Sequence, residues 1–216
     1  MSIFILNKEI VFPDVSFANE EGLLAFGGDL STERLLLAYK SGIFPWFNED
    51  ELICWWSPNP RFVLFPSELK ISKSMRTVLN NGIFKFTINK AFDQVIRNCK
   101  TVNRKDQPGS WISNQMIEAY TNLHRQGFAV SAEAWENGEL VGGLYGVLIG
   151  KVFFGESMFS LKSNASKFCF IKYIMFLQTQ NIELIDCQVY TDHLKTLGAK
   201  MIERKRFIKL LSQLIN

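Results

Sequence analysis

Hydrophobic residues recur at helix or strand spacing along most of the chain beyond residue 66. Apolar positions three and four residues apart predict helices at about residues 72–80, 90–99 and 113–126. Alternating apolar and polar positions predict strands at residues 84–88, 129–135, 139–149 and 152–157. Asn137-Gly138 falls between two of these strands, and Asn-Gly is the strongest short-range signal for a β-hairpin. The pattern therefore predicts an antiparallel meander accompanied by helices.

The C-terminal third adds a helix that is apolar on nearly every side. Residues 165–179 predict this buried helix, and residues 184–188 a short strand after it. A further short strand near residues 200–202 and a helix from residue 204 to the end complete the chain. Hairpins, a helix and a returning strand indicate an α+β domain.

The first sixty residues lack this regularity. One helix is predicted at residues 32–41, with Ser31 as its N-cap and Gly42 as its stop. The segment that follows is rich in tryptophan, phenylalanine and proline, and it predicts a rigid loop that is neither strand nor helix. We interpret it as a hinge that belongs to a small N-terminal α/β module, residues 1–62. The larger domain then comprises residues 63–216.

Composition and charge narrow the class of protein. A chain of 216 residues, 47% hydrophobic and 21% charged, is long enough to bury a core and excludes a disordered or collagen-like protein. Residues 1–51 carry a net charge of −6, residues 52–190 carry +5 and residues 191–216 carry +4. This separation suggests two modules with different partners, although solvated faces can also segregate in this way.

Metal, disulfide and membrane functions are not expected. The four cysteines are scattered without a Cys-x-x-Cys pair, and with only two histidines no zinc site of ordinary spacing is predicted. The apolar run at residues 3–6 is too short for the core of a signal peptide, and Lys172 interrupts the longest apolar run. We expect a reduced, cytoplasmic protein that is not embedded in a membrane.

Candidate chemistry lies where polar residues interrupt apolar strands. Glu156 is flanked by large hydrophobic residues, and Asp186 and Gln188 are two positions apart, which places them on one face of a regular strand. If the two strands are neighbours, the three side chains form one polar patch in apolar surroundings, which is typical of a catalytic or binding site. The alternative is that these carboxylates are structural, capping a helix or binding backbone amides.

Two other patterns leave alternatives open. Ser157, Asp186 and His193 occur in the Ser…Asp…His order of α/β-hydrolases, but the segment around Ser157 lacks the last glycine and the strand-turn-helix context of that motif. His193 beside Asp192 also suits the start of a helix.

The chain has nineteen phenylalanines and five tryptophans, which predict either an aromatic core or a surface on which nucleic-acid bases stack.

Several longer motifs occur in a fixed order. They are GLLAFGGDL at residues 22–30, GIFPWF at 42–47, WWSPNPR at 55–61, SWI at 110–112, LVGGLYG at 140–146, GESMFS at 155–160, NASK at 164–167 and LIDCQ at 184–188. On these motifs the chain resembles the leucyl/phenylalanyl-tRNA–protein transferase family over about residues 11–207. The resemblance implies an acetyltransferase-like fold for the larger domain, with a mostly antiparallel mixed sheet flanked by helices.

The resemblance also implies an activity. Members transfer Leu or Phe, and Met more weakly, from the 3′ end of aminoacyl-tRNA to the α-amino group of proteins that begin with Lys or Arg. The product is a destabilising N-terminus that bacterial degradation machinery recognises. The resemblance implies no cofactor, no membrane partner and a monomer.

Roles for individual residues follow from the same resemblance. Asp186 and Gln188 correspond to the catalytic pair, with Glu156 beside them, and Trp46 and Trp111 flank the terminal adenosine of the tRNA. The predicted pocket for the amino-acid side chain consists of Leu144, Phe153, Met158, Ser160, Phe170, Tyr173, Leu177 and Ile185. Because glutamine is not a base near neutral pH, we expect Gln188 to orient the amine or the ester carbonyl. Asp186 would polarise Gln188 or accept a proton through it.

Two functions of other classes remain as alternatives. An acetyltransferase that uses acyl-coenzyme A would need a glycine-rich pyrophosphate loop at a helix N-terminus, and residues 163–166 offer none. A non-catalytic module that binds tRNA ends would keep the tryptophans without needing Glu156, Asp186 and Gln188.

Overall fold

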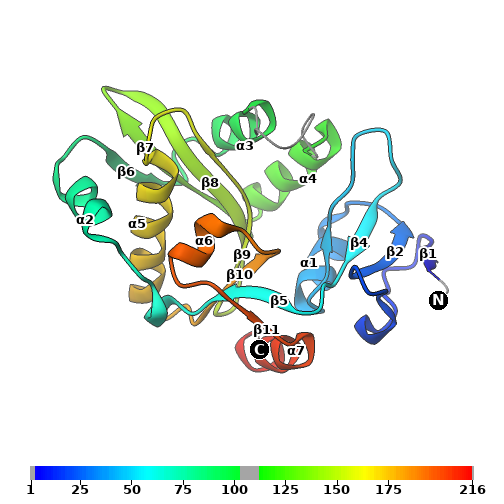
Figure 1. Ribbon diagram of the computed structural model, residues 1–216. Coiled ribbons are helices and arrows are strands. Elements are labelled where there is room, and N and C mark those ends of the chain that lie inside the picture. Colours follow the sequence, from blue (N-terminus) through cyan, green and yellow to red (C-terminus); the bar gives the residue numbers. More distant parts are fainter. Residues whose placement is uncertain (1–2, 103–111, 216) are drawn as a thin grey trace.

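Two β-sheets organise the chain, as the computed structural model shows for residues 3–102 and 112–215 (Figure 1). The smaller sheet has the strand order β1-β2-β4-β3, with β1 (Phe4–Leu6), β2 (Leu23–Gly27), β3 (Phe44–Pro45) and β4 (Cys54–Trp56). The larger sheet has the order β11-β5-β10-β9-β8-β7-β6, with β5 (Arg61–Leu64), β6 (Lys85–Ile88), β7 (Ala129–Glu136), β8 (Glu139–Ile149), β9 (Val152–Ser160), β10 (Leu184–Gln188) and β11 (Lys200–Ile202). Its pairs are antiparallel except for β9 with β10, which is parallel. The predicted α+β class with a mostly antiparallel mixed sheet is confirmed.

The helices are α1 (Thr32–Lys40), α2 (Lys73–Asn80), α3 (Phe92–Thr101), α4 (Asn114–Arg125), α5 (Ala165–Thr179), α6 (Asp192–Thr196) and α7 (Arg204–Leu214). Several of them begin at a side-chain cap, whereas α5 and α7 have none. Serine side chains accept a backbone N–H at the start of three of them, namely Ser31, Ser72 and Ser113. At α3 the buried carboxylate of Glu133 on β7 accepts the backbone N–H of Lys90 and Ala91 instead.

The prediction for the aromatic and proline-rich segment is wrong. Residues 44–65 were expected to be neither strand nor helix, yet they contain β3, β4 and β5. Proline does not prevent this, because Pro45 lies on β3, an edge strand of the smaller sheet, and Pro58 and Pro60 lie between β4 and β5. The helices and the meander are confirmed within a few residues of the predicted bounds.

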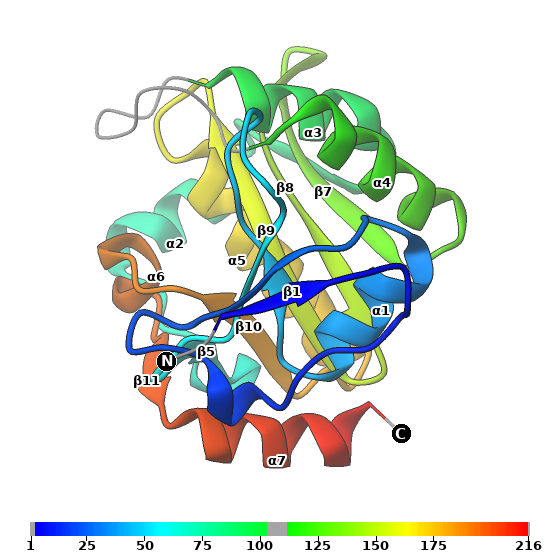
Figure 2. The same cartoon turned by 90° about the vertical axis from the view of Figure 1, so that its right-hand side faces the viewer.

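Helices cover both faces of the larger sheet (Figures 1 and 2). Alternation along β8 sends Tyr145 and Val147 into the cluster under α3 and α4, whereas Leu144 points into the cluster under α5. The helix α5 is buried along most of its circumference, as its nearly uniform apolar pattern predicts.

The smaller sheet packs against the larger domain through a shared buried cluster. Leu35 and Tyr39 on α1 belong to the same cluster as Tyr120 and Phe154. Gly42 has φ +74°, a conformation that other residues rarely adopt, and a Cβ there would meet the Ile208 side chain of α7 at 2.5 Å, so a substitution at this position would be strained. The division between residues 62 and 63 stays a prediction; it falls within β5.

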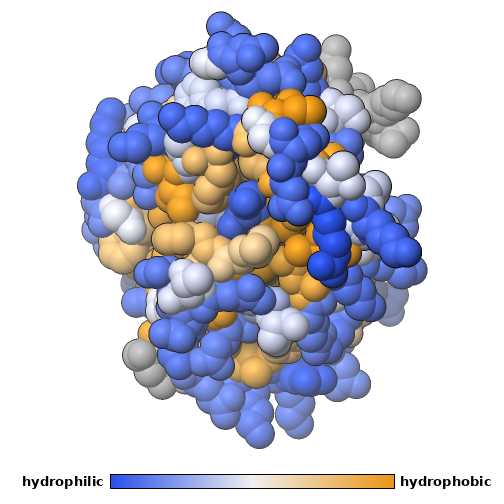
Figure 3. Space-filling model, turned by 90° about the vertical axis from the view of Figure 1, so that its left-hand side faces the viewer, coloured by the Kyte–Doolittle hydropathy of each residue, from blue (hydrophilic) through white to orange (hydrophobic). Residues whose placement is uncertain are grey.

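The surface carries both hydrophilic and apolar side chains. Figure 3 shows one face on which hydrophilic side chains surround a band of apolar ones. In the described parts of the chain, no helix combines the length and apolar character needed to cross a membrane.

Candidate active site

A cavity of about 680 Å³ opens where β8, β9 and β10 meet the start of α5, the start of α6 and β3. Much of its wall is apolar, from side chains that include Phe44, Leu144, Phe153, Met158, Phe170 and Ile185. Polar groups that line it include Glu156 and Gln188. This combination of an apolar wall and a few polar groups is typical of a binding site for a small apolar group.

The structure brings six of the eight predicted pocket residues to this cavity. These are Leu144, Phe153, Met158, Ser160, Phe170 and Ile185. Tyr173 and Leu177 do not line it, because α5 carries them one and two turns beyond Phe170. Both are buried behind the wall, and the Tyr173 ring packs edge-on against Phe153 with their centroids 5.0 Å apart.

Glu156 enters the site through a β-bulge. Tyr145 pairs with Ser157 and Gly146 pairs with Gly155, so Glu156 is the extra residue on β9. Bulges of this kind re-aim a side chain, and they are common next to active sites.

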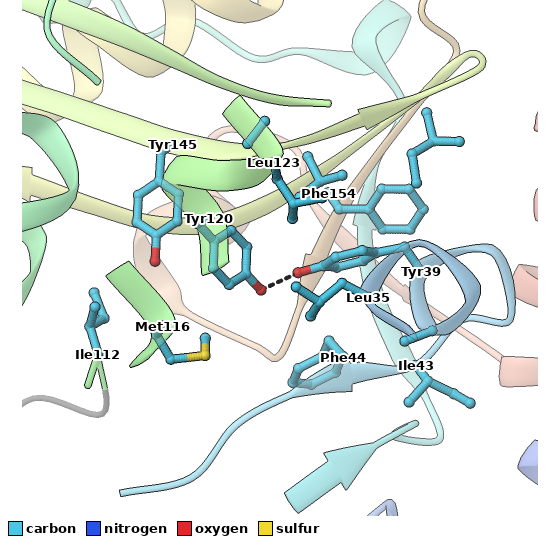
Figure 4. Close-up of a cluster of buried hydrophobic side chains, with 14 of the residues drawn as sticks. Leu35, Tyr39, Ile43, Phe44, Ile112, Met116, Tyr120, Leu123, Tyr145 and Phe154 are labelled. Atoms are coloured by element: carbon cyan, nitrogen blue, oxygen red, sulfur yellow. Dashed lines mark hydrogen bonds between the residues drawn. The ribbon is translucent and has the colours of Figure 1, made fainter. Parts of the chain in front are cut away.

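The Glu156 carboxylate receives hydrogen bonds from three other elements. Tyr39 on α1 donates to Oε1 over 2.8 Å, Tyr120 on α4 donates to Oε2 over 3.0 Å, and Nε2 of Gln188 donates to Oε1 over 2.8 Å. The two tyrosine hydroxyls can also bond to each other in place of one of these bonds, because each carries a single hydrogen; Figure 4 shows them pointing together from opposite helices. The carboxylate is therefore held by α1 of the N-terminal region and by α4 and β10 of the larger domain.

The environment adjusts the acidity of these groups. Burial raises the pKa of Glu156 to about 7; the hydrogen bonds from Tyr39, Tyr120 and Gln188 oppose this rise, and the charge of Asp186 adds to it. Burial and the neighbouring Glu156 raise the pKa of both tyrosines, so their hydroxyls remain donors near neutral pH. Glu156 can therefore gain or lose a proton near neutral pH.

Asp186 is completely buried and bound on both carboxylate oxygens. Nε of Arg61 donates to Oδ1 over 2.8 Å, and Nη2 of Arg61 donates to Oδ2 over 2.6 Å. The backbone N–H of Gln188 also donates to Oδ1, over 2.9 Å. This pairing with Arg61 argues against Asp186 orienting His193 in a hydrolase triad.

Gln188 lies at an irregular point of β10. The register with β5 shifts between Asp186 and Gln188, and Gln188 has φ +62°. The alternation of a regular strand is therefore broken between Asp186 and Gln188. The side chains of Gln188 and Glu156 still meet as predicted, because β10 pairs with β9 and Nε2 of Gln188 donates to Glu156.

Of the two tryptophans predicted to bind the terminal adenosine, Trp46 lies in the described part of the chain. Trp46 lines the cavity, is 36% exposed and packs against Trp56, with the ring centroids 5.8 Å apart. Trp111 lies outside the described residues.

His193 on α6 also lines the cavity, which the sequence interpretation as a helix start did not include. Its Nε2 is buried and has no hydrogen-bond partner within the described segments. Burial lowers the pKa of this imidazole, and the charge of Lys167 lowers it further. The imidazole is therefore favoured in its neutral form.

Three further residues complete the site and were not predicted from the sequence. Arg61 precedes the apolar run 62–65, and the same rule that identified Glu156, a charge beside large hydrophobic residues, would have found it. Tyr39 and Tyr120 occupy core positions of amphipathic helices, and nothing local indicates that their hydroxyls meet Glu156. Over residues 3–102 and 112–215, no group of three or more His, Cys, Asp or Glu side chains is arranged to hold a metal ion.

Comparison with known proteins identifies the family. The model of the leucyl/phenylalanyl-tRNA protein transferase family matches residues 63–212, and the model of the N-terminal domain of the same family matches residues 28–59. The protein of that name from Flavobacterium johnsoniae is 58% identical over 209 residues, which are 97% of this chain and 99% of the relative. The one from Syntrophobacter fumaroxidans is 53% identical over 213 residues, which are 99% of this chain and 91% of the relative.

These matches define an aminoacyltransferase. The chain belongs to the leucyl/phenylalanyl-tRNA–protein transferase family.

Solved structures offer only distant similarity. A GCN5-related N-acetyltransferase-like protein from Streptococcus suis has a TM-score of 0.39 at 11% identity, over 80% of this chain and 66% of the other. An aminoglycoside acetyltransferase from an uncultured soil metagenomic sample has a TM-score of 0.39 at 15% identity, over 54% of this chain and 84% of the other. Scores this low carry no argument about function.

Proposed function

We propose that the protein transfers Leu or Phe, and Met more weakly, from aminoacyl-tRNA to the α-amino group of proteins that begin with Lys or Arg. The observation that carries this proposal is the apolar cavity lined also by Glu156 and Gln188. A Leu or Phe side chain would occupy the apolar part, between Leu144, Phe153 and Phe170. A charged side chain would be excluded there, because burial of an unpaired charge is costly.

The ester of the aminoacyl-tRNA would then lie at the polar groups. The amine nitrogen of the acceptor attacks the ester carbonyl carbon, a C–N bond forms, and the bond from that carbon to the ribose oxygen breaks. The amine loses a proton and the ribose oxygen gains one. Because the ester is already activated, the main task of the protein is to hold the ester and the amine together in the correct orientation.

Glu156 is suited to accept the proton of the amine. Its pKa of about 7 lies close to the value of an α-amino group, about 7.7–8.0, so transfer between them is nearly balanced. Gln188, which cannot act as a base, orients the amine or the ester carbonyl through its amide. Asp186 acts through Gln188, whose backbone it binds.

Binding of the tRNA and of the acceptor completes the proposal. Trp46, together with Trp111, would stack on the terminal adenosine. The net charge of −6 on residues 1–51 offers partners for the cationic Lys or Arg of the acceptor. The modified N-terminus would mark the acceptor for degradation in the cytoplasm, and we propose that the enzyme works as a monomer without a cofactor.

The test is transfer of radiolabelled Leu or Phe from tRNA to a peptide that begins with Arg. We expect label on this peptide and little on a matched peptide that begins with Ala. Absence of label on the Arg peptide overturns the proposal. Binding of tRNA without transfer would indicate a tRNA-end-binding module, and acylation from acyl-coenzyme A would indicate an acetyltransferase.

A further inference from the structure

Gln188 has a backbone conformation that needs support. It has φ +62°, and the N–H of Val189 donates to the carbonyl of Cys187 over 2.8 Å, so Gln188 is the centre of a tight γ-turn. A non-glycine residue in the left-handed region is strained and persists only where its surroundings hold it. The position of the Gln188 amide beside Glu156 depends on this turn.

The support comes from the side chain of Asp186. Oδ1 of Asp186 accepts the backbone N–H of Gln188 over 2.9 Å, and this bond closes the loop between the two residues. The carboxylate can hold Gln188 only if its own orientation is fixed. Arg61 fixes it, since Nε and Nη2 of Arg61 bind the two oxygens in the fork geometry that guanidinium and carboxylate share.

Arg61 is itself held by aromatic rings from two distant segments. Its guanidinium carbon lies 4.7 Å from the ring centroid of Phe44 on β3 and 4.7 Å from that of Phe207 on α7. Arg61 is 1% exposed and Asp186 is 0% exposed. A buried ion pair of this kind rarely stabilises a fold more than apolar side chains of the same size would. Its presence here therefore calls for a reason other than stability.

We propose that Arg61 is a positioning residue for transfer, acting through Asp186 on the backbone of Gln188. This inference rests on the proposed function. The guanidinium orients Asp186, Asp186 holds the left-handed turn at Gln188, and the turn presents the Gln188 amide to Glu156 and the substrate. Arg61 does not touch the substrate; its contribution is the geometry of Gln188.

The variant that tests this is Arg61→Lys, which keeps the charge and the stem but loses the bidentate fork. Its matched control is Arg34→Lys. Arg34 is also completely buried, forms an ion pair with Asp29 and does not line the cavity. The two substitutions are chemically identical, so loss of a buried guanidinium alone affects both in the same way.

The first readout is steady-state transfer from Phe-tRNA to a peptide that begins with Arg. For Arg61→Lys we expect kcat to fall about 100-fold, the usual cost of displacing a reacting group by about 1 Å, with KM for Phe-tRNA within about threefold of the wild type. Arg34→Lys should keep kcat within about threefold. An equal loss of kcat in both variants, an unchanged kcat in Arg61→Lys, or a change confined to KM would each overturn the inference.

The second readout does not depend on activity. In protein labelled with 15N-glutamine, the backbone amide of Gln188 should exchange slowly with solvent in the wild type and in Arg34→Lys, and faster in Arg61→Lys. Unchanged exchange in Arg61→Lys would refute the inference. Failure of the wild type to transfer label would instead refute the proposed function, and the exchange measurement would still decide whether Arg61 holds Gln188.

Discussion

Replacing Glu156 by Gln should change how the stability of the protein depends on pH. Burial raises the pKa of Glu156 from 4.5 to about 7. Between these values the folded protein keeps a proton that the unfolded chain has released, so the free energy of unfolding falls as the pH rises. Well above pH 7 both states are ionised and the loss is complete. The shift corresponds to a total loss of about 3 kcal/mol, most of which falls between pH 5 and pH 8.

The Glu156→Gln variant lacks this titration but keeps an acceptor and a similar shape. The free energy of unfolding of the variant, measured by urea denaturation, should therefore rise relative to that of the wild type by about 2 to 3 kcal/mol on going from pH 5 to pH 8. Titration of groups that do not interact with Glu156 cancels in this difference. Glu139→Gln, at an exposed position on β8, is the matched control and should leave the difference near zero. Parallel curves for wild type and Glu156→Gln would refute a raised pKa at Glu156.

Three further predictions concern transfer itself. Asp186→Asn should abolish transfer while leaving the affinity for aminoacyl-tRNA nearly intact; a filter-binding assay that shows lost affinity would make Asp186 a structural or binding residue. Leu144→Trp narrows the cavity, so kcat/KM for Phe-tRNA should fall about tenfold more than for Leu-tRNA, and an equal fall for both substrates would argue against a side-chain pocket here. Trp46→Ala should raise KM for aminoacyl-tRNA by about 5- to 150-fold, the value of one stacked base, whereas Trp46→Phe should retain most of the affinity; an unchanged KM in Trp46→Ala would contradict stacking.

Local pattern was sufficient to predict most of the fold. The helices and the meander follow from spacing of apolar residues, and the Asn137-Gly138 turn follows from backbone chemistry. The strands of the smaller sheet were missed, because β1, β3 and β4 contain only two or three residues each and give no usable alternation. Pro45 also argued against a strand at β3. An edge strand nevertheless tolerates a residue without an N–H, and β3 is such a strand.

The candidate site was predictable only in part. The sequence predicted Glu156, Asp186 and Gln188 as site residues, and the parallel pairing of β9 with β10 explains why they lie close together. The bulge at Glu156 and the turn at Gln188 depend on the register of neighbouring strands, which residue spacing within one strand does not contain. The role of Tyr39 was equally hidden, because it lies 117 positions from Glu156 along the chain.

The contacts of Tyr39 and Phe44 have a consequence for how the enzyme is made. Both residues leave the ribosome long before β9, the strand that carries Glu156. Phe44 also precedes Phe207 on α7 by most of the length of the chain. Until those later segments emerge, Tyr39 lacks its contacts with Phe154 and Glu156 on β9, and Phe44 lacks the Arg61–Phe207 stack, although Tyr120 on α4 is already present. Since contacts between distant segments form late, the catalytic geometry is completed only after α7 has been synthesised. A prematurely terminated chain would then hold the first half of the site and have no transferase activity.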